Sequence, residues 1–161
     1  KWWASEHVGV VPDLMTFAKG IGSGFPIGGV SGNNNIFNSM SKNSLGGTYN
    51  GNAISSAACN ATIETIIEEK LLENSILMGD KIKNEISNLP YIKEVRQYGL
   101  FIGVEIVNSI DVSKIIEKAI DNKLILIGCG KNSLRIIPSL VINEEEVDIF
   151  LDKLNLTMAK I

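Results

Sequence analysis

The chain is organised around residues 12–29, PDLMTFAKGIGSGFPIGG. A mostly apolar run over residues 14–18 ends at a single lysine, Lys19, and glycines follow at positions 20, 22 and 24. This pattern predicts a short buried strand that delivers Lys19 into a tight glycine-rich loop. A lysine that is partly removed from water at the mouth of a strand can serve as an amine nucleophile or as a base. The alternative is an ordinary solvated lysine on a flexible turn, and these residues alone leave both open.

The composition is that of a soluble globular protein. Of the 161 residues, 45% are hydrophobic and 20% are charged, and the net charge of −3 leaves no basic face for nucleic acid. No apolar run approaches the roughly 20 residues that span a bilayer, so we expect no membrane partner. Two cysteines, Cys59 and Cys129, fit free thiols in a reducing compartment. We therefore expect a cytoplasmic protein. The chain begins at Lys1 without a methionine, which suggests a fragment.

The rest of the N-terminal half predicts one more strand and two helices. The strand covers residues 26–31, and the helices cover residues 36–40 and 53–70. A loop of residues 44–52, SLGGTYNGN, comes before the long helix, and in it two glycines precede Thr48. Backbone N–H groups and a hydroxyl in such a turn can cradle a phosphate. A plain loop before a helix is the alternative.

The C-terminal half has a different texture, with short strands between amphipathic helices. A helix over residues 74–89 stops at Pro90, two strands meet around Gly99, and Asn143 with Glu146 forms a capping box for the last helix. The predicted order after the boundary near residues 89–91 is strands 92–98 and 100–107, helix 112–121, strands 124–127 and 134–137, and the final helix. This order indicates a compact α+β domain with its helices on one face of a sheet.

Arg135 is the second candidate site residue. It interrupts the apolar strand LRIIP, and a buried arginine is costly unless it is paired. Its planar guanidinium suits a carboxylate, which it can bind through two parallel hydrogen bonds. The alternative is an arginine at a strand edge in a structural salt bridge, and the same alternative applies more strongly to Arg96.

Four stretches in this order and spacing resemble the second half of a class III aminotransferase, a pyridoxal-phosphate enzyme of fold type I. They are residues 12–30, the loop LGGTYNGN, residues 95–106 (VRQYGLFIGVEI) and residues 124–140 (LILIGCGKNSLRIIPSL). The resemblance covers essentially the whole chain. It implies an α/β fold in which residues 1–89 are the end of the large, cofactor-binding domain with a linking helix. Residues 90–161 would then be the small α+β domain.

The resemblance also implies roles for individual residues. Lys19 stands where the family lysine forms a Schiff base with the cofactor. Thr48 stands where a threonine reaches the cofactor phosphate of the neighbouring subunit, which implies a homodimer. Arg135 stands where an arginine receives the α-carboxylate of glutamate or 2-oxoglutarate. Arg96 and Gly99 belong to the family pattern without a catalytic role, and no metal is implied.

Within the family, the sequences of the threonine loop and of residues 123–130 resemble those of 4-aminobutyrate aminotransferases. Acetylornithine or ornithine aminotransferases are the same-family alternative, and a non-catalytic structural domain of the same fold is the third. Family chains are more than twice this long. The residues that bind the pyridine nitrogen, stack on the ring, hold most of the phosphate and read the distal substrate carboxylate lie in the half that is missing here. We therefore expect the 161-residue chain alone to be inactive as a transaminase.

Overall fold

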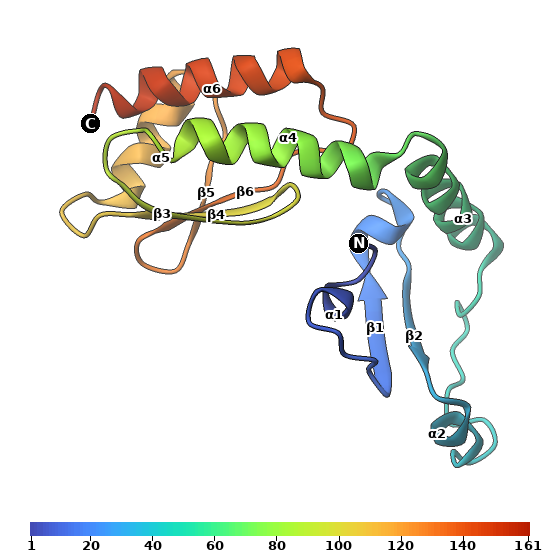
Figure 1. The fold of residues 1–161 in the computed structure, drawn as a ribbon. Coiled ribbons are helices and arrows are strands. Elements are labelled where there is room, and N and C mark those ends of the chain that lie inside the picture. The colour runs from blue at the N-terminus through green and yellow to red at the C-terminus, as the bar shows by residue number, and fades with distance from the viewer. The chain divides into compact units, whose positions relative to one another are not determined.

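The computed structural model describes all residues from 1 to 161. Contacts within the chain divide it into two compact units, Lys1–Lys70 and Leu71–Ile161, coloured from blue to dark green and from light green to red in Figure 1. The sequence places its domain boundary one helix later, near residues 89–91. The difference arises because the helix in between packs against a strand and a helix of the second unit. No helix is long and apolar enough to cross a membrane.

The first unit is built around a two-stranded antiparallel hairpin. Strand β1 (Leu14–Ala18) pairs with β2 (Gly28–Gly32), with Leu14 opposite Gly32 and Ala18 opposite Gly28. Both strands are predicted, β2 two residues earlier than observed. The expectation that β1 is buried is wrong, because its residues alternate between half-buried and exposed. The hairpin is closed by the 3-10 turn η1 (Lys19–Gly22).

Three helices accompany the hairpin, and asparagines begin two of them. Helix α1 (Ala4–His7) precedes β1. Asn33 accepts a hydrogen bond from the Asn35 backbone at the start of α2 (Asn34–Asn38), and Asn52 accepts one from Ser55 at the start of α3 (Ala53–Glu68). Side-chain oxygens at this position satisfy N–H groups that have no partner within the helix. The sequence predicts α3 within two residues, and α2 starts two residues before its prediction.

The second unit contains a four-stranded antiparallel sheet in the order β3-β4-β6-β5. Its strands are β3 (Ile92–Tyr98), β4 (Phe101–Ile106), β5 (Ile127–Cys129) and β6 (Ser133–Ile136). The β3–β4 pair around Gly99 is predicted. Strand β5 begins where its prediction ends, because the turn that joins it to β6 sets the pairing of Cys129 with Ser133.

Three helices cover one face of this sheet, α4 (Leu71–Ile86), α5 (Val112–Asp121) and α6 (Glu144–Met158), with α4 and α6 drawn above β3 and β4 in Figure 1. This confirms the predicted arrangement. Alternate residues of β4 and β6 point into the core, while α5 contributes Val112, Ile115 and Ala119. Ile120, the residue after Ala119, is 62% exposed. The core contains Met78, Ile82, Ile86, Ile102, Val104, Ile106, Ile115, Leu134, Ile136, Val147, Leu151, Leu154 and Met158.

A close approach of two glycines joins α4 to the β3–β4 turn. Gly99 adopts a φ of +56°, which makes a tight turn easy for a residue without a side chain. A β-carbon on Gly79 would overlap the carbonyl oxygen of Gly99, so the helix can lie this close only with glycine there. Lys81, two residues after Gly79 in α4, pairs with Glu144 and Asp148 of α6. The predicted capping box at the start of α6 is confirmed, with Asn143 and Glu146 exchanging hydrogen bonds of 3.0 Å.

The opposite face of the sheet, here called the open face, carries the side chains that point away from the helices. Strand pairing aligns them in rows: Tyr98 with Phe101; Arg96, Gly103, Arg135 and Ile127; and Glu94, Glu105, Ser133 and Cys129. Cys129 and Cys59 are both free thiols, as the sequence predicts.

Candidate active site

Lys19 directly follows the last residue of β1 and has a strained backbone conformation. Its φ is +57°, while Ala18 before it is fully extended. The left-handed region costs an L-residue with a β-carbon on the order of 1–2 kcal/mol. Such strain persists where the surrounding structure fixes the residue, and it clusters at functional sites. The side chain of Lys19 is exposed and has no ion pair or hydrogen bond, so the predicted partial removal from water is not seen within this unit.

Helix α3 supports the loop that follows Lys19. Gly22 is buried, and a β-carbon there would lie 2.6 Å from Cγ2 of Ile27. The Thr62 hydroxyl donates a hydrogen bond of 3.1 Å to the Ser23 hydroxyl, which itself lies on a left-handed residue. The sequence reasoning missed this supporting role. The signal was present in ISSAACNAT, residues 54–62, because small side chains on a helix allow another segment to approach closely.

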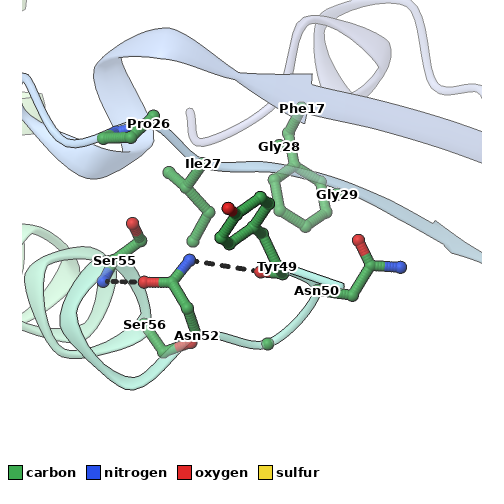
Figure 2. Close-up of a pocket in the computed structure, with 11 residues that line it drawn as sticks. Phe17, Pro26, Ile27, Gly28, Gly29, Tyr49, Asn50, Asn52, Ser55 and Ser56 are labelled. Carbon is green, nitrogen blue, oxygen red and sulfur yellow. Dashed lines mark hydrogen bonds between the residues drawn. The ribbon is translucent and has the colours of Figure 1, made fainter. Parts of the chain in front are cut away.

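The loop that contains Thr48 lies beside the hairpin and encloses a hollow of about 750 Å³ with it. Figure 2 shows Tyr49 and Asn52 on one side of this hollow, and Phe17 and Ile27 on the other. The Asn52 side chain bonds the carbonyl oxygen of Tyr49 as well as the Ser55 N–H, so it fixes the end of the loop to α3. Neither Lys19 nor Thr48 lines the hollow. Thr48 is exposed, and its hydroxyl has no protein partner.

Arg135 lies on β6, in the interior of the second unit's sheet. Its neighbours Leu134 and Ile136 are buried, so alternation directs Arg135 to the open face. It is exposed and forms no ion pair. The structural alternative for Arg135, a salt bridge at a strand edge, is therefore wrong, and its role in binding a carboxylate stays a prediction. Its guanidinium is free to receive a carboxylate.

Arg96 lies in the same row of the open face but, unlike Arg135, its guanidinium is paired. Its guanidinium pairs with Glu94 and with Glu105, the latter at 3.1 Å, and Glu105 also accepts a hydrogen bond of 2.6 Å from Lys93. The hydrogen bonds from Lys93 and Arg96 lower the pKa of Glu105. The bond to Glu105 raises the pKa of Arg96, and the one to Glu94 raises it further. The structural salt bridge predicted for Arg96 is thus confirmed.

The three predicted site residues are distributed over both units. Lys19 and Thr48 belong to the first unit, at the end of the hairpin and in the loop before α3. Arg135 belongs to the second unit, on the open face of its sheet. All three present a polar group that no protein partner occupies.

Comparison with known proteins identifies the family of the chain. Residues 1–158 match the family of class III aminotransferases. The chain therefore belongs to the class III aminotransferases. It is 36% identical to the 5-aminovalerate aminotransferase DavT of Pseudomonas aeruginosa over 91% of its length, 35% to the 4-aminobutyrate aminotransferase GabT of Escherichia coli over 90%, and 38% to the acetylornithine aminotransferase of Methanosarcina mazei over 95%.

Solved structures show the same fold. An S-selective transaminase from an Arthrobacter species superposes with a TM-score of 0.89 at 27% identity, over 99% of this chain and 41% of that one. The chain spans 38% of the length of DavT and 37% of that of GabT. The mixed α/β architecture of the two units is that of the pyridoxal-phosphate-dependent aminotransferases.

Class III aminotransferases depend on pyridoxal phosphate, and the residues present here fit that group. The cofactor needs a primary amine, and Lys19 offers one without an ion pair. Ideal β-carbons on Gly20 and Gly24 would meet nothing within 4 Å, so these positions leave open space beside the lysine. The cofactor phosphate needs hydrogen-bond donors, and the Thr48 hydroxyl is unoccupied.

Proposed function

We propose that the complete protein transfers an amino group from an ω-amino acid, with 4-aminobutyrate as the first candidate, to 2-oxoglutarate. The observation that carries this proposal is Lys19, an unpaired amine held on a left-handed residue at the end of β1. The names of DavT and GabT support an ω-amino donor, because 5-aminovalerate and 4-aminobutyrate are both ω-amino acids.

Two residues of the first unit would hold the cofactor. Lys19 would bind it through its amine, and Thr48 would donate its hydroxyl to the phosphate held by a second copy of the chain in a homodimer. Pyridoxal phosphate, when bound, supplies the electron sink that allows a proton to leave the carbon next to the amino group. The Lys19 amine, once released by the substrate's amino group, would take and return that proton.

Arg135 would bind the α-carboxylate of glutamate and 2-oxoglutarate. A free guanidinium can form two parallel hydrogen bonds to one carboxylate, which fixes the orientation of the acid as well as its affinity. In an ω-amino donor such as 4-aminobutyrate, the carbon that bears the amino group carries no carboxylate. The two halves of the reaction would therefore depend on Arg135 to different degrees.

An acetylornithine or ornithine donor is the second candidate. It is favoured by the acetylornithine aminotransferase of Methanosarcina mazei, which is as similar to this chain as the ω-amino acid enzymes are. Rates for a panel of 4-aminobutyrate, 5-aminovalerate, ornithine and acetylornithine with the complete protein would separate the two. A purely structural domain is disfavoured, since neither Lys19 nor Arg135 contributes an ion pair to the fold.

The Lys19→Ala substitution tests the proposal in the complete protein. We expect the visible absorption band of the lysine-bound cofactor to disappear, and kcat to fall by at least about 100-fold, the scale of a lost acid–base group. Lys42→Ala is the matched control, because Lys42 is also an exposed lysine of the first unit. An absorption band that survives unchanged in Lys19→Ala would show that another residue holds the cofactor.

The Arg135→Ala substitution tests the carboxylate role. We expect KM for glutamate and 2-oxoglutarate to rise about 10- to 100-fold, the value of one hydrogen-bonded charged contact. Lys93→Ala is the control, because it removes a cation from the same face that is already paired with Glu105. A change in stability without a change in these KM values would assign Arg135 to the fold.

A further inference from the structure

Gly103 occupies the centre of the row on the open face that contains both arginines. On β4 it pairs with Arg96 of β3 on one side and with Arg135 of β6 on the other. Residues that face each other across antiparallel strands have β-carbons roughly 5 Å apart, so a side chain at position 103 would lie directly against the stem of Arg135. Glycine leaves that space open.

The open space is part of a hollow of about 300 Å³, lined by Arg96, Tyr98, Phe101, Gly103, Cys129 and Arg135, among others. This volume stands at the lower end of the roughly 300–1,000 Å³ typical of ligand pockets. Phe101 and Tyr98 supply apolar surface at one end, since they face each other across β3 and β4 and are 59% and 65% exposed. The hollow thus combines a guanidinium, aromatic surface and a floor without a side chain.

The fold itself does not require glycine at position 103. A β-carbon there would meet nothing within 4 Å, and the residue has an ordinary strand backbone. Gly79 and Gly99 differ, because one makes a backbone contact that a β-carbon would block and the other adopts a positive φ. Glycine inside a strand makes the strand less stable than a residue with a side chain would. What glycine provides here is the empty space beside Arg135.

The charges around the hollow favour a ligand with one negative group. Three cations, Lys93, Arg96 and Arg135, share this face with two carboxylates, Glu94 and Glu105. The ion pairs of the face use both carboxylates on Lys93 and Arg96. Of the three cations, only Arg135 remains unpaired, so one further carboxylate would give it an ion-pair partner.

We propose that Gly103 is a specificity-determining residue, whose missing side chain holds open the space through which a small carboxylic acid places its carboxylate on Arg135. This inference rests on the proposed function of Arg135. It predicts that the size of the side chain at position 103 sets the affinity for glutamate and 2-oxoglutarate, and leaves an ω-amino donor without an α-carboxylate unaffected.

Graded substitutions in the complete, cofactor-loaded protein test the proposal. We expect Gly103→Val to raise KM for 2-oxoglutarate and glutamate by about 10-fold or more, and Gly103→Ala by less, the scale of one misplaced methylene in a pocket. The dissociation constant of glutarate, an unreactive dicarboxylate titrated against the cofactor's absorption, should rise by the same factor. The kcat/KM for 4-aminobutyrate should stay within about twofold of wild type.

Ile127→Val is the matched control, because Ile127 pairs with Arg135 from the other side but does not line the hollow. Equal shifts in Ile127→Val and Gly103→Val would overturn the inference, since the effect would then come from the sheet.

The outcome for Arg135 separates this inference from the proposed function. Unchanged KM and glutarate affinity in both Gly103 variants, with a selective loss in Arg135→Ala, would overturn only the inference about Gly103. If Arg135→Ala itself leaves these values unchanged, the proposed function of Arg135 fails and the inference fails with it. If Gly103→Val does not fold, Gly103→Ala decides by the same criteria.

Discussion

The two units differ in where their stability comes from. The second unit contains the whole hydrophobic core, with Ile82, Ile106 and Ile115 among its fully buried residues. In the first unit only Gly22 and Ser55 are buried, and Val11 and Tyr49 are 94% and 84% exposed. The proposed catalytic amine therefore belongs to the unit with the least internal packing. A large exposed apolar surface usually marks a region that another segment or partner covers.

Hydrogen exchange would show the largest difference between the units. In the 161-residue chain we expect amides of β4 and β6 to exchange only through global unfolding, and those of β1 and β2 through local opening. With global stabilities of 5–15 kcal/mol in typical domains, the exchange rates should differ by at least about 1,000-fold. Equal protection in both sheets would mean that the first unit is as stable as the second.

A pair of isoleucines would sharpen the comparison at single residues. Ile106→Ala removes a fully buried side chain of β4 and should destabilise the second unit by about 2–5 kcal/mol. Ile54→Ala changes a side chain of α3 that is 70% exposed, and should stay within about 0.5 kcal/mol. Urea unfolding followed by circular dichroism measures both. A large loss in Ile54→Ala would reveal packing in the first unit that its burial does not show.

The glycine contact between α4 and the β3–β4 turn should be the next most sensitive point. Alanine favours a helix interior over glycine by about 1 kcal/mol, which alone predicts a gain for Gly79→Ala. The new methyl would overlap the carbonyl oxygen of Gly99, and overpacking costs about 1–3 kcal/mol. We expect a net loss, seen as a lower melting temperature. A rise in melting temperature would show that α4 can move away from the turn at no cost.

The smallest expected effect is the acid sensitivity of the open face. The pKa of Glu105 is lowered in the folded chain, so the carboxylate stabilises the fold above its ordinary pKa of 4.5. That contribution disappears as the pH falls through the lowered value. Glu105→Gln should therefore lower the urea midpoint more at neutral pH than at about pH 3. An equal reduction at both pH values would assign the effect to packing instead of charge.

Periodicity and turn residues were enough to predict most of the elements. The strand β5 is the clearest error, because residues 124–127 form a continuous apolar run with no signal for where pairing starts. The turn at Gly130, with a φ of +66°, fixes that point instead. In α5 the buried residues are spaced three and four apart, and Ile120 falls one residue beyond that stripe.

The sequence was enough to name the candidate site residues. It was not enough to predict their ion pairs or their exposure. The alternation Leu134–Arg135–Ile136 already indicates that Arg135 lies on the face opposite the core. That Arg96 is paired and Arg135 is free depends on which carboxylates the strand register places nearby, and no local pattern contains that information. The exposure of Lys19 likewise depends on the few side chains that its unit can bring around it.

The left-handed backbone at Lys19 would place the proposed activity and the stability of the chain in opposition at one residue. Glycine would relax a conformation that costs a residue with a side chain about 1–2 kcal/mol, and would lose about 0.5–1 kcal/mol of this gain to the greater freedom of the unfolded chain. Glycine, the residue with the least backbone strain at this position, thus has no side-chain amine. Random mutagenesis selected only for a more stable chain should accumulate glycine at position 19, whereas selection for amino transfer should retain lysine.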